Sequence, residues 1–415
     1  MTNNGSPGLS YYLPEPDKIR TVLQIPGSHT LYAGPLSCTR RHAIHAMQFG
    51  DRKNISFLFI TEADVISGRY EELIVQSIGQ LLAVVEPSPH IFFIAVFCID
   101  DFLGTDEAAL LDTLRKTYPD RQFALEHIDP VTLDEQINMG TRKHANLYSF
   151  IKPAAKHDNG INFLGNFVSL EPECEFLSLL RKWGCDPVRE LFQCQNYDEY
   201  QDLGKSRLAV VIRFMGERSA GYMRDKLGIP YYIFAASYDP QVIAGGYSDI
   251  AQLLGKTPPD FTAAIAAAKI DAAATAKLIG GIPVAVDCSA SLMPFAMAKA
   301  LLDYGFNVKY VFRSNHSYKT DAAAENYIVE NCPQVQITRA ESYTHLCEAI
   351  GESDCLAVGA DCARILRAKH YADIWHDEGY FGFHGIRRLM KDIRDAMNTI
   401  TDWSNLPELQ RKGND

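Results

Sequence analysis

The sequence lacks several features that would assign it to a class of proteins. None of its apolar runs reaches the roughly 18–20 residues that a membrane-spanning helix needs, and the longest, Ile91–Ile99, has the length of a strand. The 40 Lys and Arg residues are outnumbered by 51 Asp and Glu residues, which gives a formal net charge of -11. Since nucleic-acid-binding proteins rely on an excess of positive charge, we expect neither a membrane protein nor a general nucleic-acid binder.

Two nucleotide-binding motifs and a secretory signal are also absent from the sequence. It contains neither G-x-G-x-x-G nor G-x-x-x-x-G-K-[ST], so we expect no bound dinucleotide of the usual kind and no ATP site in this chain. Residues Met1–Gly27 are polar and rich in Pro and Gly, without the basic start and apolar core of a secretory signal. We therefore expect a cytoplasmic protein whose thiols stay reduced and are able to bind metal.

The composition and the hydrophobic pattern favour a large α/β protein. Hydrophobic residues make up 47% of the 415 residues, and strand-like runs alternate with amphipathic helical stretches, as in parallel sheets covered by helices. A polar stretch at Lys152–Gly160 and an alanine-rich connecting helix at Ala263–Ala276 divide the pattern into three series. We predict three Rossmann-like, doubly wound parallel-sheet domains over residues 1–152, 153–278 and 279–415, with C-terminal helices in the last.

Two of the ten cysteines stand at positions where chemistry is expected. Cys38 closes a tight Gly-Pro turn between the predicted strand Thr30–Ala33 and a predicted helix, and Cys98 directly follows the predicted strand Ile91–Phe97. Both should lie at one edge of the first sheet, and helix N-termini stabilise thiolates and suit anionic clusters. Composition alone favours the other interpretation, in which each is a buried apolar cysteine.

Five short segments, in order along the chain, resemble those of nitrogenase component 1 proteins and their relatives. Tyr32–Cys38 (YAGPLSC) is similar to H-G-P-x-G-C, and Phe59–Gly68 is similar to E-x-D-x-V-F-G-G. Val96–Asp101 resembles C-x-x-x-x-I-G-D-D, Leu227–Tyr231 (LGIPY) resembles Y-G-I-P, and Gly379–Gly382 (GYFG) resembles the C-terminal G-Y-x-G. Each segment is short, but their order and spacing cover most of the chain.

The resemblance implies a specific architecture and reaction. Members of this family have three Rossmann-like domains and pair as homodimers or heterodimers, with an iron–sulfur cluster held at the dimer interface by cysteines of the first domain. A separate ATP-hydrolysing iron–sulfur protein docks over the cluster and supplies electrons one at a time, which pass to a substrate or cofactor among the domains.

The number of cysteines departs from the nitrogenase pattern. The larger nitrogenase clusters use three cysteines per subunit, but residues 1–37 contain none, so the match carries over only to Cys38 and Cys98. Two thiolates from each of two chains make the four that a [4Fe–4S] cluster needs, so we expect a homodimer with one bridging cluster. A heterodimer with a related subunit stays open, as does a cluster ligand among the carboxylates of Asp100, Asp101 and Glu62.

The nitrogenase cofactor ligands also lack counterparts. The family's cofactor cysteine would fall near Val211–Arg213, where no cysteine stands, and the histidine ligand has no clear match although His376 and His384 flank the C-terminal motif. We therefore expect a nitrogenase-like reductase without the iron–molybdenum cofactor, and leave open a second metallocofactor of other identity. Arg213 is a candidate for binding an anionic substrate, and His376 and His384 for donating protons, in the interdomain cleft.

Three substrate classes have precedent in the family: the conjugated ring of a tetrapyrrole, the carbon–sulfur bonds of small thioethers, and a small multiply bonded molecule. The two-cysteine first domain most resembles the homodimeric tetrapyrrole-reducing branch. One alternative function is a scaffold that assembles or carries a metallocluster without turnover. Another is a metal-free binding protein or transferase, which would require Cys38 and Cys98 to lie far apart or away from a dimer interface.

Overall fold

The computed structural model describes residues 25–48, 51–128, 139–313, 320–339 and 353–404. These residues divide into two compact units. One unit combines the described residues up to 167 with residues 185–234, and the other combines residues 168–184 with the described residues from 235 onward. Each unit is described on its own.

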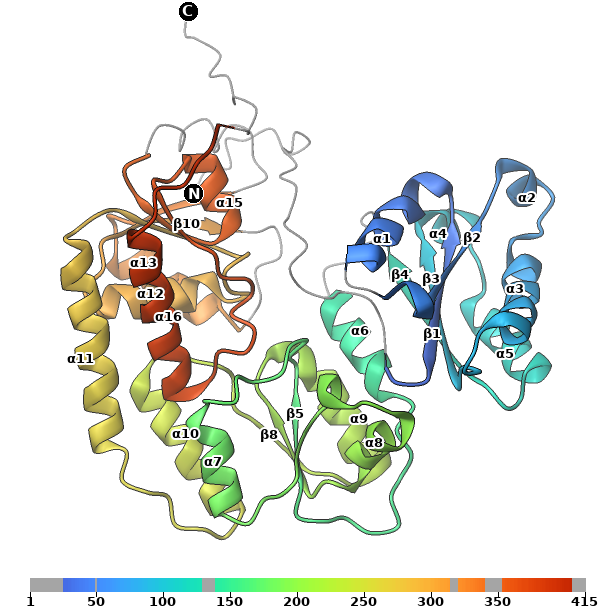
Figure 1. The fold of residues 1–415 in the computed structure, drawn as a ribbon, viewed down its shortest axis with the longest axis horizontal. Helices are drawn as coiled ribbons and strands as arrows, with labels where there is room; N and C mark the ends of the chain where they lie inside the picture. The colour runs from blue at the N-terminus through green and yellow to red at the C-terminus, as the bar shows by residue number, and fades with distance from the viewer. Residues whose placement is uncertain (1–24, 49–50, 129–138, 314–319, 340–352, 405–415) are drawn as a thin grey trace, which may run out of the picture. The chain divides into compact units, whose positions relative to one another are not determined.

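The first sheet, in the N-terminal part of the first unit, is entirely parallel and has the order β2-β1-β3-β4. Its strands are β1 Ser28–Gly34, β2 Ile55–Phe59, β3 Ile91–Phe97 and β4 Gln122–Ile128. Its helices are α1 Leu36–Gln48, α2 Glu62–Ile66, α3 Tyr70–Val84, α4 Cys98–Leu103 and α5 Glu107–Thr117 (Figure 1). Every residue of β3 is buried, because a parallel sheet is covered on both faces.

The second sheet completes the same unit. It is parallel with the order β6-β5-β7-β8, from β5 Ile161–Leu164, β6 Val188–Glu190, β7 Leu208–Val211 and β8 Tyr231–Ile233. The longer helices around it are α6 Met139–Tyr148, α8 Tyr197–Asp202 and α9 Glu217–Leu227. Buried side chains of both sheets, among them Phe93 and Val211, share one hydrophobic cluster.

The second unit contains a five-stranded parallel sheet in the order β11-β10-β9-β12-β13. Its strands are β9 Val284–Asp287, β10 Val308–Arg313, β11 Gln336–Arg339, β12 Leu356–Val358 and β13 His370–Ala372. The helices of this unit include α7 Glu175–Lys182, α10 Pro240–Leu253, α11 Thr262–Ile279, α12 Pro294–Asp303, α13 Ala322–Asn331, α15 Ala360–Leu366 and α16 Gly382–Met397. The chain returns to the centre of the sheet at β12, so the sheet is doubly wound about β9.

A glycine permits the close approach of the two central strand ends in this third sheet. Gly359 follows β12 with φ of +117°, and a Cβ there would lie 2.2 Å from the carboxylate of Asp287. That carboxylate is fully buried and accepts hydrogen bonds from the backbone N–H groups of Ser289 at 2.7 Å and Cys362 at 2.5 Å. The Asp287 carboxylate at the end of β9 therefore connects the segments that follow β9 and β12.

The predicted fold class is confirmed, because the structure is α/β with three sheets that contain only parallel pairs. Two local details differ from the sequence-based expectation. The helix after β1 begins at Leu36, so Cys38 lies inside its first turn, and Cys98 begins a short helix that was not predicted. The division into domains at residues 152 and 278 stays a prediction. Within the described ranges, no helix is both long and apolar enough to cross a membrane.

Candidate functional site

The two candidate cluster ligands lie at the same edge of the first sheet. Strands β1 and β3 are parallel neighbours, with Ala33 paired to Val96, and Cys38 and Cys98 follow the carboxyl ends of these strands. The chain runs outward from β1 to β2 and returns to β3, so the strand order reverses between them. Open α/β sheets bind their ligands outside the carboxyl ends of strands at such a point.

Both cysteines are half-buried and are held by short elements. The backbone N–H of Cys38 donates to Pro35 O at 3.0 Å, which begins the first turn of α1. The side chain of Cys38 packs against a buried cluster that includes Tyr32 and Phe97. Cys98 is the first residue of α4, directly after the last buried residue of β3. Each thiol therefore lies just beyond the carboxyl end of a buried strand.

Close packing at this edge explains the residues that surround the cysteines. A Cβ at Gly34 would lie 2.4 Å from the ring of Phe97, so only glycine fits between the ends of β1 and β3. The ring of Tyr32 stacks on His42 of α1 with centroids 4.8 Å apart, and on Phe57 of β2 at 5.4 Å. Aromatic contacts thus connect α1 to two neighbouring strands.

Large apolar side chains are exposed on elements at this edge. They follow or flank the carboxyl ends of β1, β2 and β3, and Figure 1 shows α1, α2 and α4 at that end of the sheet. We call them the apolar rim: Leu36, Phe59, Ile66, Phe102 and Leu103. Leu36 is 62% exposed and Phe102 is 77% exposed. Large apolar side chains exposed on neighbouring elements are a feature of protein interfaces.

The donor set at the edge fits an iron–sulfur cluster only in part. Thiolate sulfur is the ligand that such clusters prefer, but one chain offers two thiols here, and a [4Fe–4S] cluster takes four. Of the three candidate carboxylates, Asp100 is buried, whereas Asp101 and Glu62 lie on exposed helix positions. The remaining ligands therefore have to come from outside the chain or from a carboxylate of α4 or α2.

The three predicted substrate residues are divided between the two units. Arg213 is 4% exposed and follows β7 in the first unit, where the strand order of the second sheet reverses. A Cβ at Gly165 would lie 2.3 Å from the carbonyl oxygen of Arg213, so the loops after β5 and β7 touch. His376 and His384 belong to the other unit.

His384 belongs to a network of charged groups at the start of α16. Its imidazole Nε2 contacts the carboxylate of Glu171, which also pairs with Arg388 at 3.3 Å. Its backbone N–H donates to the carboxylate of Glu175 at 2.9 Å. These contacts are those of a helix N-terminus with an acidic cap.

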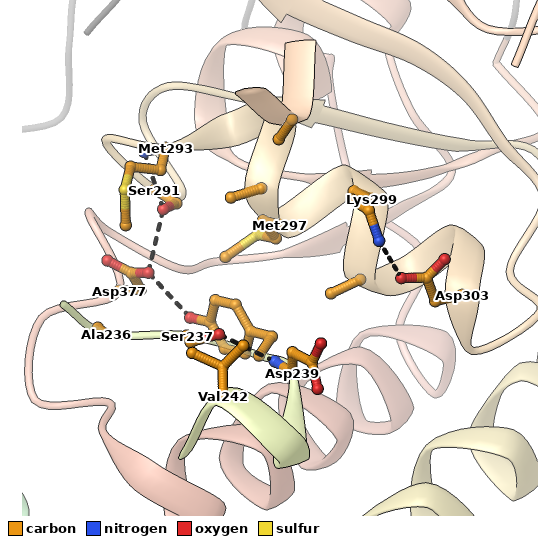
Figure 2. A pocket seen from close by; sticks show the side chains of 14 residues that line it. Ala236, Ser237, Asp239, Val242, Ser291, Met293, Met297, Lys299, Asp303 and Asp377 are labelled. Carbon is orange, nitrogen blue, oxygen red and sulfur yellow. Dashed lines mark hydrogen bonds and ion pairs between the residues drawn. The ribbon is translucent and has the colours of Figure 1, made fainter. Parts of the chain in front are cut away.

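His376 directly precedes Asp377, which lines a cavity of the second unit that the sequence did not predict (Figure 2). His376 and Asp377 have φ values of +47° and +43°, which are unusual for non-glycine residues, and the His376 N–H donates to Ser289 O at 2.6 Å. The buried carboxylate of Asp377 accepts hydrogen bonds from Tyr238 at 2.9 Å and Ser291 at 3.0 Å. The cavity, of about 220 Å³, is therefore polar at one end.

The same cavity has a distinct lining at its other end. Met297 contributes apolar surface between the two ends, and at the far end Lys299 pairs with Asp303 at 2.6 Å, as Figure 2 shows. The sequence feature that could have indicated this cavity is the pair Ser289 and Ser291, just after β9. At this point the third sheet reverses its strand order. Asp377 gave no signal, because the fold brings it to these serines from more than 80 residues away.

Four of the seven other cysteines that the structure describes are packed in the interior. Cys174, Cys185, Cys355 and Cys362 are buried, and Cys347 lies outside the described residues. Burial raises the pKa of the Cys362 thiol well above its ordinary value, and its sulfur contacts the carbonyl oxygen of Gly359 at 3.5 Å. Burial likewise raises the pKa of Cys194 to about 12. A buried thiol that resists ionisation is a poor metal ligand.

Comparisons with known proteins agree with this architecture. The sequence model of the family described as nitrogenase component 1 type oxidoreductase matches residues 19–398. A solved structure described as "Nitrogenase Cp1 at pH 6.5" is similar with a TM-score of 0.68 and 14% identity, covering 91% of this chain and 90% of that chain. A second, "Nitrogenase Cp1 at pH 5", has a TM-score of 0.56 and 14% identity, covering 90% and 85%. A comparison with curated proteins gives no match. At this identity the likeness to the solved structures shows the fold alone.

Proposed function

Because the chain belongs to the nitrogenase component 1 type oxidoreductase family, we propose that it is the catalytic component of a two-component, ATP-dependent, nitrogenase-like reductase. The observation that carries the proposal is the pair Cys38 and Cys98 at the strand-order reversal of the first sheet, amid the apolar rim. The family works with a separate reductase partner and binds iron–sulfur clusters. An interfacial [4Fe–4S] cluster would supply one-electron storage between that partner and the substrate.

The cluster assignment follows from counting ligands. Cys38 and Cys98 supply two thiolates, and a twofold axis at the apolar rim doubles them to the four that the cluster takes. A symmetric dimer buries the same surface of both copies, so Leu36 and Phe102 would be covered on each. Since the thiols have to stay reduced, we place the protein in the cytoplasm. A heterodimer with a related chain would use the same edge.

The substrate is a small molecule or a tetrapyrrole in this proposal. Arg213 supplies a permanent positive charge at a strand end, suited to a carboxylate, and His376 directly precedes Asp377 at the polar end of the cavity of Figure 2. Histidine exchanges protons near neutral pH, so His376 and His384 are the proposed proton donors. At about 220 Å³, the cavity is smaller than typical sites for drug-sized ligands, so a tetrapyrrole would need further space.

The second candidate function is a metallocluster assembly scaffold. It uses the same family fold and the same two cysteines, but consumes no substrate. A scaffold would release its cluster to an acceptor, whereas a reductase retains its cluster through repeated electron transfer. The two functions therefore differ in the lability of the bound iron and in the response to a reductase partner with ATP.

The test is anaerobic purification followed by iron and sulfide analysis and EPR spectroscopy. We expect about four irons and four sulfides per dimer, with loss of this content in Cys38→Ala and Cys98→Ala. Cys332→Ala is the matched control, because Cys332 is also half-buried but stands at the end of α13, far along the chain from both motifs. An iron-free dimer after anaerobic reconstitution, or a Cys38→Ala protein with unchanged iron, would contradict the proposal. ATP-dependent reduction of a retained cluster by the partner favours the reductase over the scaffold.

A further inference from the structure

Three side chains with metal-binding atoms converge next to the cysteine edge without including either cysteine. Asp100 on α4, Glu107 on α5 and His127 on β4 each place one ligand atom so that all three lie within 4.8 Å of one another. They come from three consecutive elements of the first sheet. No spacing motif marks these residues, because the fold brings His127 to Glu107 across 20 residues.

The buried member of the group is a carboxylate that lacks a complete set of partners. Asp100 is 1% exposed, and its Oδ1 forms no hydrogen bond with any residue that the structure describes. A buried carboxylate of this kind is stabilised when an opposite charge reaches it.

The histidine is oriented as a metal ligand usually is. One ring nitrogen, Nε2, contacts Glu107 Oε1, and the other, Nδ1, lies 3.7 Å from Asp101 Oδ2. Metal-binding histidines commonly have a carboxylate on the nitrogen opposite the metal, which fixes the tautomer and the ring plane. The side chain of His127 is only 10% exposed, so its position is set by packing.

Charge balance also favours a cation at this position. Asp100 and Glu107 bring two carboxylates close together beside one imidazole. Among the described residues, no lysine or arginine pairs with either carboxylate, so His127 is their one positively charged neighbour, and only when it is protonated. A divalent ion would neutralise both carboxylates while the imidazole stays neutral.

We propose that Asp100, Glu107 and His127 form a binding site for a divalent transition-metal ion, separate from the cysteine edge and holding α4 against α5 and β4. One imidazole nitrogen and two carboxylate oxygens suit Mn²⁺, Fe²⁺ or Zn²⁺ rather than the soft ions that thiolates select. Ligand distances near 2.1 Å require the direct contact between His127 and Glu107 to open, so that the ion enters between the two side chains. Glu107, whose side chain is 45% exposed, has the freedom to make this movement.

The experiment uses Mn²⁺ as the probe, because this ion prefers oxygen and nitrogen ligands to thiolates. The full-length chain is titrated with Mn²⁺, and the EPR signal of free Mn²⁺ reports binding. We expect one site per chain, weakened at least tenfold in Glu107→Gln and in His127→Gln. Asp112→Asn is the matched control, since Asp112 is an exposed carboxylate on the same helix, and its variant should bind Mn²⁺ as the parent does.

Two further measurements separate the Mn²⁺ site from the cluster site and from non-specific binding. The Cys38→Ala/Cys98→Ala double variant should keep the Mn²⁺ site, because the site uses neither thiol, even if the cluster proposal fails. Saturating Mn²⁺ should raise the melting temperature of the parent chain and of Asp112→Asn but not that of Glu107→Gln, since only a native site stabilises the fold. Absence of Mn²⁺ binding by the parent, equal binding by Glu107→Gln, or loss of binding in the double cysteine variant would overturn the proposal.

Discussion

A buried histidine in the first unit shows how strongly a single residue responds to its surroundings. His144 of α6 is fully buried, and its Nε2 accepts the backbone N–H of Gly165 at 2.9 Å. Its Nδ1 lies 2.6 Å from Ser219 Oγ and therefore carries the proton as donor. Burial lowers the pKa of His144 to about 3, so the imidazole stays neutral in the folded chain.

This residue should make the protein less stable in weak acid. Below pH 6.5 the unfolded chain takes up a proton that the folded His144 refuses down to a pH of about 3, so the free energy of unfolding falls as pH falls. The slope contributed by His144 reaches about 1.4 kcal/mol per pH unit. Urea unfolding between pH 7 and pH 5 should therefore show a shallower pH dependence in His144→Gln than in the parent chain.

The control for this prediction is His90→Gln, which removes an imidazole from an exposed position instead of the core. Some slope will remain in His144→Gln, because burial also lowers the pKa of His29 to about 4. Equal slopes in the parent and in His144→Gln would contradict the assignment of a neutral, buried imidazole at this position.

At the residue scale, the sequence revealed only those site residues that stand beside a recognisable strand end. Cys38 and Cys98 each follow an apolar run that is typical of a strand in a parallel sheet. Their position at one edge of the first sheet was therefore predictable. Asp377 and His127 were not predictable, because each meets its partners through contacts between elements separated in the sequence. Periodicity reports which face of an element is buried, but not which distant element covers it.

At the scale of elements, α16 depends on a carboxylate from another helix. Glu175 of α7 accepts the first free N–H groups of α16, from Phe383 at 2.7 Å and His384 at 2.9 Å. It also accepts the buried hydroxyl of Tyr247 at 2.7 Å. A negative charge at a helix N-terminus is favourable. Glu175 therefore caps α16 although it belongs to a different helix, α7.

Removing this cap should destabilise the second unit. We expect Glu175→Ala to lower the free energy of unfolding by about 2 kcal/mol, because two N–H groups and one buried hydroxyl lose their acceptor. Glu173→Ala is the control, since Glu173 is an exposed carboxylate two residues earlier, and its effect should stay within about 0.5 kcal/mol. Chemical denaturation measures both, and comparable losses in the two variants would argue against the capping role.

The elements that could be predicted are those with a strong local pattern. The apolar run Ile91–Phe97 is β3 over the same residues, and the alanine-rich stretch lies within α11. Strands β4, β6, β11 and β13 were missed; each lies at an edge of its sheet and depends on pairing with one neighbouring strand. The six-residue helix α4 was missed because it is too short to show a helical pattern, although it carries Cys98.

For the whole molecule, the apolar rim and the cysteine count point to the same conclusion. Exposed apolar side chains at the edge that carries Cys38 and Cys98 would be unfavourable in an isolated chain, and two thiols leave a four-ligand cluster incomplete. A symmetric partner would cover the exposed apolar side chains and would also supply the two missing thiolates. Neither observation alone requires a dimer, since exposed apolar groups occur on monomers and carboxylates also ligate iron.

Charging the apolar rim should therefore remove the dimer and the cluster together. Leu36→Asp places a carboxylate in the first turn of α1, where negative charge is tolerated, so the chain should still fold. Ile270→Asp on α11 is the control, because Ile270 is 69% exposed and belongs to the other unit. Anaerobic sedimentation and iron analysis should give a monomer with little iron for Leu36→Asp and an iron-containing dimer for Ile270→Asp. A Leu36→Asp monomer that retains its iron would mean that one chain completes the cluster, with carboxylates such as Asp101 and Glu62 in place of the partner's two thiolates.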